Sequence, residues 1–238
     1  MKTCFIKPFL AAAALFPALL FADAPLFFED FNSGETEAPN SPLSAIGWSA
    51  YLTTEGKTIE SAGGGYRVYV ETNGYSSDSS EYRNIRVGNQ TANLKATNYL
   101  VAAQASGGKL HPITLDDYSS LSVRWEQGSR LENLSAFLAI EVDGKWYASQ
   151  RSFRIDDERL GYRKWQEMGP IDLMNEGWTR INLEVGNVLS LDSSLTYADL
   201  KAIGGSTLTG IGWYMEDFSG PPAIAFAKLE IVGEKNTQ

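Results

Sequence analysis

Aromatic and polar side chains of the kind that contact sugars stand together at two places in the chain. Trp146 and Tyr147 are consecutive, and Tyr162, Arg163 and Trp165 fall within one polar stretch. The C–H faces of a sugar ring stack on Trp and Tyr rings, while charged and amide groups bind its hydroxyls. We therefore expect these five residues to form a ligand-binding patch. The alternative role for each ring is ordinary packing, which is the commoner fate of large aromatic residues.

The residue types give little support for catalytic chemistry. His111 is the only histidine and Cys4 the only cysteine, which excludes a zinc site of the usual composition. No Gly-x-Ser-x-Gly turn is present to carry a serine nucleophile beside His111. Asp156, Asp157 and Glu158 are consecutive, so a strand would send neighbouring carboxylates to opposite faces. A glycosidase needs two carboxylates on one face, and we assign no catalytic residue.

The first 24 residues have the features of a secretory signal peptide. Lys2 and Lys7 precede a short apolar run, and Ala22-Asp23-Ala24 has the small-x-small form of a cleavage site. We expect cleavage to leave residues 25–238 as the mature chain, without Cys4 and so without a disulfide. Disulfide-free export favours a bacterial periplasm or exterior over a eukaryotic secretory route.

The charge and hydropathy of the chain narrow the range of partners. The formal net charge is −9, whereas nucleic acids and anionic membranes select basic surfaces. No second apolar segment of spanning length follows the signal peptide. We therefore expect no nucleic-acid partner and no membrane span.

Period-two hydropathy predicts strands throughout the mature chain. Val123 and Trp125 alternate with charged residues, and residues 138–142 repeat the pattern. Asp143-Gly144 then separates two such runs, which is a strong signal for a two-residue hairpin turn. Short strands at regular spacing, with no βαβ pattern, predict an all-β, antiparallel β-sandwich of jelly-roll type in a single domain, residues 25–238. Residues 154–169 are predicted to form a long polar loop, and residues 197–202 carry the only helix-like pattern.

Four segments resemble a known group of proteins. They read FFEDF, DGKWY, GWTRINL and TGIGWYMEDFSGPPAIAFAKLEIVG, and they span nearly all of the mature chain. Together they resemble the β-jelly-roll modules of secreted bacterial proteins, which include carbohydrate-binding modules and galactose-binding-like domains. The resemblance implies adjacent first and last strands and a carbohydrate or cell-surface glycan as the partner.

The same resemblance implies a structural Ca²⁺ near the first and last strands. Glu29, Asp30 and Asp217 are the positions that would supply its ligands. Ca²⁺ takes six to eight oxygen ligands, so these carboxylates would need backbone carbonyls beside them. The alternative is that they are ordinary solvated strand ends.

Taken together, the residues and the resemblance favour an exported, non-catalytic protein that binds carbohydrate through exposed aromatic rings. Two alternatives stay open. One is a structural envelope or extracellular-matrix protein without a small ligand. The other is a glycan-cleaving jelly-roll enzyme, either a hydrolase or a lyase, because one fold hosts many functions.

Overall fold

The fold consists almost entirely of antiparallel strands. The computed structural model describes residues 24–31, 43–60, 68–71, 84–88, 96–129, 134–155, 165–192, 198–216 and 223–237. Within these ranges there are fifteen strands, two short 3₁₀ segments (η1, Leu43–Ile46; η2, Leu115–Asp117) and no α-helix. The predicted all-β sandwich of jelly-roll type is confirmed.

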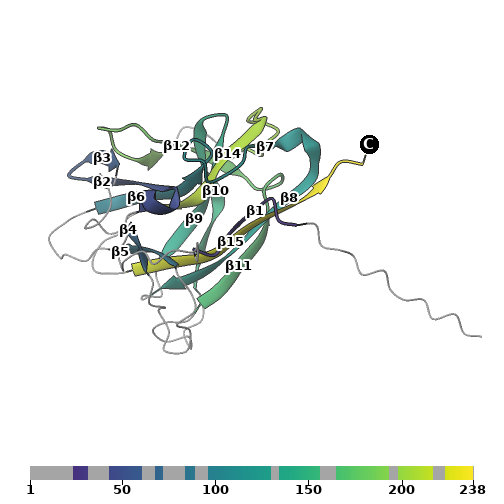
Figure 1. Cartoon of the computed structure of the whole chain (residues 1–238). Helices are drawn as coiled ribbons and strands as arrows, with labels where there is room; N and C mark the ends of the chain where they lie inside the picture. The colour runs from purple at the N-terminus through teal and green to yellow at the C-terminus, as the bar shows by residue number, and fades with distance from the viewer. Residues whose placement is uncertain are drawn as a thin grey trace, which may run out of the picture.

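The strands form two sheets that face each other (Figure 1). The six-stranded sheet has the order β11 (Trp165–Asp172), β8 (Tyr118–Ser129), β15 (Ala223–Lys235), β5 (Asn84–Gly88) and β4 (Val68–Glu71), with β1 (Phe27–Glu29) paired to β15. The nine-stranded sheet has the order β13 (Ser190–Leu191), β12 (Trp178–Asn182), β10 (Lys145–Arg154), β9 (Ser135–Val142), β14 (Thr207–Met215), β6 (Ala96–Gln104), β2 (Trp48–Thr54) and β3 (Lys57–Glu60), with β7 (Ile113–Thr114) paired to β14. The first and last strands are neighbours, as the family resemblance implies.

A column of aromatic rings fills the space between the sheets. Trp213 on β14 stacks on Phe226 of β15 with ring centroids 4.1 Å apart, and on Trp48 of β2 at 5.5 Å. Trp125 of β8 meets Trp213 edge-on at 6.4 Å. All four side chains are buried, and for Trp125 this agrees with the alternation seen in the sequence. These rings hold the two sheets together and leave the outer faces free for other roles.

The Asp143-Gly144 hairpin forms as the sequence predicts. Both residues have positive φ, 49° and 75°, and they join β9 directly to β10. The Asp143 carboxylate accepts hydrogen bonds from the backbone N–H of Ser206, at 2.9 Å, and of Thr207, at 3.1 Å. The Ser206 bond in particular holds the pKa of Asp143 below its usual value. The turn is thereby tied to the start of β14.

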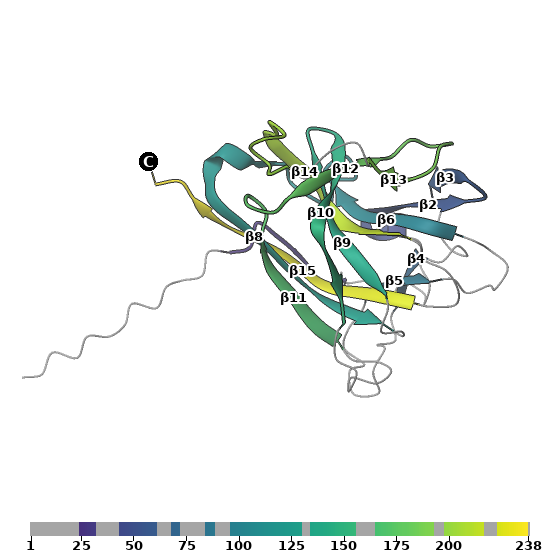
Figure 2. The ribbon, with the colours of Figure 1, turned by 180° about the vertical axis from the view of Figure 1, so that it is seen from behind.

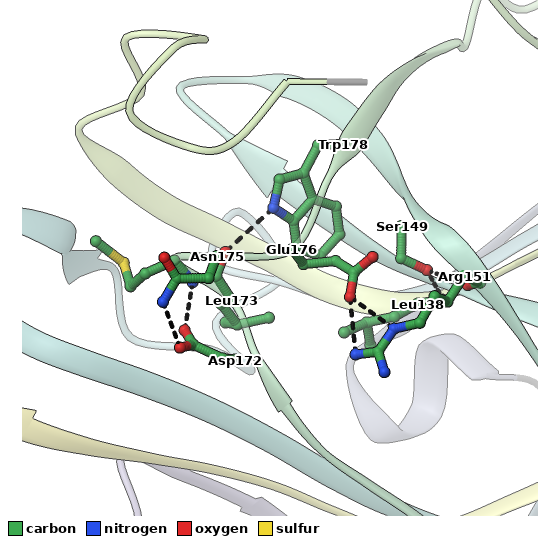
Figure 3. Close-up of polar contacts among 9 residues, drawn as sticks. Leu138, Ser149, Arg151, Asp172, Leu173, Asn175, Glu176 and Trp178 are labelled. Atoms are coloured by element: carbon green, nitrogen blue, oxygen red, sulfur yellow. Dashed lines mark hydrogen bonds and ion pairs between the residues drawn. The ribbon is translucent and has the colours of Figure 1, made fainter. Parts of the chain in front are cut away.

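A short turn carries the chain from β11 in one sheet to β12 in the other (Figure 3). The Asp172 carboxylate accepts hydrogen bonds from the Met174 backbone N–H, at 2.9 Å, and from the Asn175 amide, at 2.6 Å. The indole N–H of Trp178 donates to the Leu173 carbonyl at 3.1 Å. Trp178 is buried, so its ring anchors the start of β12 in the core.

The β9–β10 pairing contains a bulge between Ala148 and Ser152 that side chains satisfy (Figure 3). The Ser149 hydroxyl accepts the backbone N–H of Leu138 at 3.0 Å and donates to the Arg151 carbonyl at 2.7 Å. The Arg151 guanidinium reaches the buried carboxylate of Glu176 at 2.9 Å. These contacts replace the ladder bonds that the bulge interrupts.

Two sequence-based predictions of local structure are wrong. Of the predicted loop over residues 154–169, residues 156–164 lie outside the described ranges, but residues 165–169 belong to β11, where Trp165 pairs with Gly128. The helix-like pattern over residues 197–202 yields a single bridge at Ala198 and turns after it. In both stretches, pairing with a distant strand overrides a weak local preference.

Candidate functional site

A row of four cross-strand partners runs over the outer face of the nine-stranded sheet. Trp146 on β10 pairs with Glu141 on β9, which pairs with Gly210 on β14, which pairs with Gln104 on β6. Because side chains on paired positions point to the same face, the indole, the carboxylate and the amide share one surface. Their strand neighbours at inward positions lie in the aromatic core.

This row lines a pocket of about 680 Å³. The volume falls within the range of about 300–1,000 Å³ that is usual for small-molecule sites. The sheet contributes Tyr51, Gln104, Glu141, Trp146, Arg180 and Asn182 to the lining. The segment after β12 contributes Leu183, Glu184, Asn187 and Val188.

Glu141 is held in place by two neighbouring side chains. The hydroxyl of Thr209 donates to one carboxylate oxygen at 3.0 Å, and the Gln104 amide lies 3.4 Å from the other. A β-carbon at Gly210 would lie 2.8 Å from both the Trp146 ring and the Glu141 β-carbon. Glycine at this position therefore allows the indole and the carboxylate to approach over β14. The result is an apolar ring beside a fixed acceptor.

Tyr51 adds a phenol to the same pocket from β2. Burial raises its pKa, and the nearby charges of Glu60 and Glu141 raise it further. The phenol therefore keeps its proton throughout the neutral range. A neutral hydroxyl can both donate and accept a hydrogen bond, which suits a ligand rich in hydroxyl groups.

The charged residues of the pocket balance one another. Lys145 and Arg180 contribute two positive charges, and Glu141 and Glu184 contribute two negative charges. The chain as a whole has a net charge of −9. The pocket is therefore a locally neutral region of an acidic protein, and its electrostatics favour an uncharged polar ligand.

A second row of outward residues, beside the first, consists of small side chains. Ala148, Ala139, Gly212, Ala102 and Ser49 are successive cross-strand partners on β10, β9, β14, β6 and β2. The alanines of this row are buried in one cluster with larger side chains, namely Leu100, Trp146, Ile181, Leu189 and Tyr214.

The structure does not bring the predicted ligand patch together. Trp146 lines the pocket with only 4% of its surface exposed, while Tyr147 points to the opposite face and packs against the core. Trp165 lies in the other sheet, where its ring covers Gly128. Tyr162 and Arg163 lie outside the described residues. Trp146 is thus the one predicted residue that the structure places in this pocket.

The predicted calcium ligands are also only partly described. Glu29 is buried and accepts hydrogen bonds from the Trp48 indole, at 3.1 Å, and the Phe31 backbone, at 2.8 Å. Its carboxylate also forms an ion pair with Lys109 at 2.6 Å. Within the described ranges no three His, Cys, Asp or Glu residues cluster as metal ligands, and Asp217 lies outside those ranges. Asp30 is half-buried. The calcium site therefore remains a prediction.

Sequence reasoning missed Tyr51, Gln104, Glu141 and Arg180 as pocket residues. One local signal was available for Glu141, which interrupts the apolar run Leu138–Val142 at an outward position. A lone carboxylate among apolar residues on a well-predicted strand is a candidate site residue. The other three come from separate strands whose pairing the local pattern does not reveal.

Searches against known proteins reveal similarity only in three dimensions. No family model matches the sequence, and no curated protein does. A solved exo-β-agarase superposes with a TM-score of 0.47 and 12% identity over 90% of this chain and 25% of its own length. A family 11 carbohydrate-binding module of the cellulase Lic26A-Cel5E of Clostridium thermocellum gives 0.42 and 13%, over 88% of this chain and 95% of the module. A putative sugar-binding protein from Bacteroides thetaiotaomicron gives 0.41 and 11%, over 89% of this chain and all of its own.

These matches concern the kind of fold. One of them is a carbohydrate-binding module and another a putative sugar-binding protein, at TM-scores below 0.5 and identities of 13% or less. Among the described residues, no helix is long and apolar enough to cross a membrane.

Proposed function

We propose that this protein is an exported, non-catalytic binder of a neutral glycan, with its site in the pocket on the outer face of the nine-stranded sheet. The observation that carries the proposal is the row of Trp146, Glu141 and Gln104, which sets an apolar ring beside a fixed carboxylate and an amide. Sugars need this pairing of an apolar surface with hydrogen-bonding groups.

Each type of lining group has a role toward such a ligand. Glu141 and Gln104 accept and donate hydrogen bonds to hydroxyls, and the Tyr51 phenol adds a neutral partner. The edge of Trp146 and the half-exposed Val188 offer apolar contact to C–H groups. Charge balance within the pocket avoids selecting an ionic ligand.

The pocket is organised before the ligand arrives. Thr209 and Gln104 already orient the Glu141 carboxylate, so binding costs little side-chain entropy at that position. Groups fixed in advance bind more tightly than groups that must be ordered by the ligand. The proposal therefore places the largest share of the specificity in Glu141.

The test is calorimetric titration with a panel of neutral oligosaccharides. Replacing Glu141 with Gln keeps the shape and removes the charged acceptor, and we expect at least tenfold weaker binding. Glu167→Gln is the matched control, because it makes the same change at an exposed position on the other sheet. Equal affinities of the two variants, or no binding by the wild type, would contradict the proposal.

A reducing-end assay on mixed polysaccharides separates binding from cleavage. We expect no new reducing ends after prolonged incubation with the wild-type protein. Release of product that Glu141→Gln abolishes would assign the pocket to the glycan-cleaving alternative.

A further inference from the structure

Strand β14 contains one residue more than its pairing with β9 requires. The strand lies between β9 and β6 in the nine-stranded sheet (Figures 1 and 2). Leu208 pairs with Val142, and the next pair along the ladder is Gly210 with Glu141. Thr209 therefore has no partner of its own on β9. Two residues of β14 oppose one residue of β9 at this point, which is the arrangement of a β-bulge.

The sheet itself gives no reason for this extra residue. Leu208 packs in the core between the sheets, and Gly210 lies on the outer face beside Glu141, so these two residues already alternate as in a regular strand. Without Thr209 they would pair with consecutive residues of β9. An inserted residue of this kind requires a reason outside the ladder, and bulges beside binding sites serve to aim a side chain.

Both residues of the bulge meet the same carboxylate oxygen. The Thr209 hydroxyl donates to Oε2 of Glu141 at 3.0 Å. A β-carbon at Gly210 would lie 3.1 Å from that oxygen, so glycine leaves room for it. The Thr209 hydroxyl also lies 3.4 Å from the backbone carbonyl of Glu141, but a hydroxyl has one proton, and the shorter distance assigns it to the carboxylate. The bulge thus holds Oε2 against β14.

The other carboxylate oxygen is then the one that a ligand can use. Oε1 of Glu141 lies 3.4 Å from the Gln104 amide, which is long for a hydrogen bond and leaves the oxygen able to accept another donor. Glu141 lines the pocket, whereas Thr209 is not among the described residues that do. Thr209 therefore acts on a bound molecule through Glu141.

The bulge in β10 of the same sheet is built differently. There the Ser149 hydroxyl bonds backbone groups, namely the Leu138 N–H and the Arg151 carbonyl (Figure 3). It repairs the ladder that its own bulge interrupts. The Thr209 hydroxyl instead bonds a side chain at the pocket. Repair of the ladder thus accounts for the bulge in β10 and leaves the bulge in β14 unexplained.

We propose that Thr209 is a positioning residue of the glycan site, and that the bulge places its hydroxyl on Oε2 of Glu141 so that Oε1 faces the ligand. This inference rests on the proposed function and names the device that aims its main acceptor. The site needs the extra residue, and the sheet does not.

The test is calorimetric titration with three neutral tetrasaccharides, of β-1,4-linked glucose, xylose and mannose. Thr209→Val keeps the branched shape and removes the hydroxyl, and we expect about three- to tenfold weaker binding of the tetrasaccharide that the wild type binds most tightly. Thr209→Ser restores the hydroxyl, and its affinity should lie within about twofold of the wild type. Thr207→Val makes the same change earlier on β14, outside the pocket lining, and should bind as the wild type.

A double-mutant cycle shows whether Thr209 acts through Glu141. In the Glu141→Gln variant the charged acceptor is already gone, so we expect the further change Thr209→Val to weaken binding by about twofold at most. A purely structural role of Thr209 would give the same loss with and without the carboxylate. Equal losses in the two backgrounds would therefore overturn the inference.

Deletion of Thr209 separates the site from the fold. The deletion restores regular alternation, so we expect a folded protein by circular dichroism and thermal unfolding, with binding weakened by about tenfold or more. Loss of the fold would show that the sheet needs this residue and would overturn the inference. So would an unchanged affinity of the folded deletion variant.

A crystal structure of Thr209→Val without sugar gives a readout that does not depend on binding. We expect the Glu141 carboxylate to leave its position over Gly210, because its donor on β14 is gone. An unchanged carboxylate would overturn the inference.

The outcomes distinguish the inference from the proposed function. Wild-type binding that Glu141→Gln weakens and Thr209→Val does not would overturn the inference and leave the glycan site in place. No binding of the three tetrasaccharides by the wild type would contradict the proposed function, while the crystal structure would still decide how Glu141 is held.

Discussion

The outer faces of the two sheets carry similar residue types in different arrangements. On the six-stranded sheet, Arg124 pairs with Glu230, and Lys228 pairs with Glu126, each across neighbouring strands β8 and β15. The hydrogen bond to Glu230 raises the pKa of Arg124. These charges neutralise one another as solvent-facing ion pairs around a smaller hollow of about 260 Å³.

On the nine-stranded sheet the polar groups converge on one hollow. Glu141 is oriented by uncharged partners, Thr209 and Gln104, and lies beside the Trp146 ring. A carboxylate that uncharged partners hold in place beside a pocket is available to a ligand. Both faces carry charged residues, so their presence does not distinguish a binding face from a solvated one. The partners of each charged residue do.

A pair of glycine substitutions, one in each sheet, gives the largest expected difference in stability between the two sheets. A β-carbon at Gly212 would lie 1.9 Å from the Val101 carbonyl oxygen on the neighbouring strand, whereas at Gly128 the nearest atom is in the Trp165 ring at 3.3 Å. Backbone cannot move aside as a half-buried ring can. We expect Gly212→Ala to lower the free energy of unfolding by roughly 3 kcal/mol or more, and Gly128→Ala by less than about 1 kcal/mol.

Urea unfolding followed by tryptophan fluorescence measures both changes. Equal losses for the two variants would contradict the close packing of β14 against β6.

A second test asks whether burial decides the contribution of a charge. Glu29 is buried with Lys109 and the Trp48 indole, while Glu230 pairs with a half-exposed Arg124. We expect Glu29→Gln to cost roughly 2 kcal/mol and Glu230→Gln less than about 1 kcal/mol, because breaking a buried pair leaves an unpaired charge. Thermal unfolding of both variants gives the comparison.

The same thermal assay addresses the predicted calcium. If Lys109 is the cation that Glu29 requires, the wild-type Tm will be the same in EDTA as in added Ca²⁺. An increase in Tm with Ca²⁺ that EDTA reverses would support the calcium site predicted at Glu29, Asp30 and Asp217.

A third test uses the pH dependence of the hairpin that borders the pocket. Hydrogen bonds from Ser206 and Thr207 lower the pKa of Asp143 from its ordinary value of 3.8. A lowered pKa stabilises the fold at pH values above 3.8, and this stabilisation is lost as the pH falls through the folded-state pKa. We expect Asp143→Asn, which tolerates the positive φ, to lose less than about 1 kcal/mol at pH 7 because the group is exposed.

The variant should also lose less stability than the wild type when the pH is lowered from 5 to 2. Parallel stability curves for the two proteins over that range would show that the Asp143 contacts contribute nothing.

The smallest expected effect is on the solvated face. Arg124→Gln removes one ion pair at a side chain that is 54% exposed. We expect a loss of about 0.5 kcal/mol or less, and no change in glycan binding. Calorimetric titration and urea unfolding check the two statements. Weaker glycan binding by this variant would place a ligand site on the six-stranded sheet and break the contrast between the faces.

The parts of the fold that follow from local chemistry were predictable from the sequence. Asp143-Gly144 specifies its own turn, because both residues tolerate positive φ. Period-two alternation likewise predicts that Trp125 faces the core, and its side chain is buried. The sequence predicts a loop at Trp165 because residues 154–169 are mostly polar, and no local pattern reveals the pairing of Trp165 with β8.

The site was less predictable than the fold. The pocket joins Tyr51, Gln104, Glu141 and Arg180 from four strands, and their proximity depends on a sheet order that no local pattern encodes. Adjacent aromatic residues were a misleading guide. Trp146 and Tyr147 point to opposite faces, so neighbours in the sequence became separated in space.

Strand β15 has a consequence for how the protein is made. It is the last strand in the chain, yet it occupies the middle of its sheet, between β8 on one side and β5 and β1 on the other. Because a ribosome releases the amino-terminal strands first, the β8–β11 pair and the β4–β5 pair are not joined into one layer until residues 223–235 emerge. Loss of those residues would remove the central strand of the layer and leave the strands on either side without a partner at that edge. A truncated chain would therefore be a substrate for proteolysis.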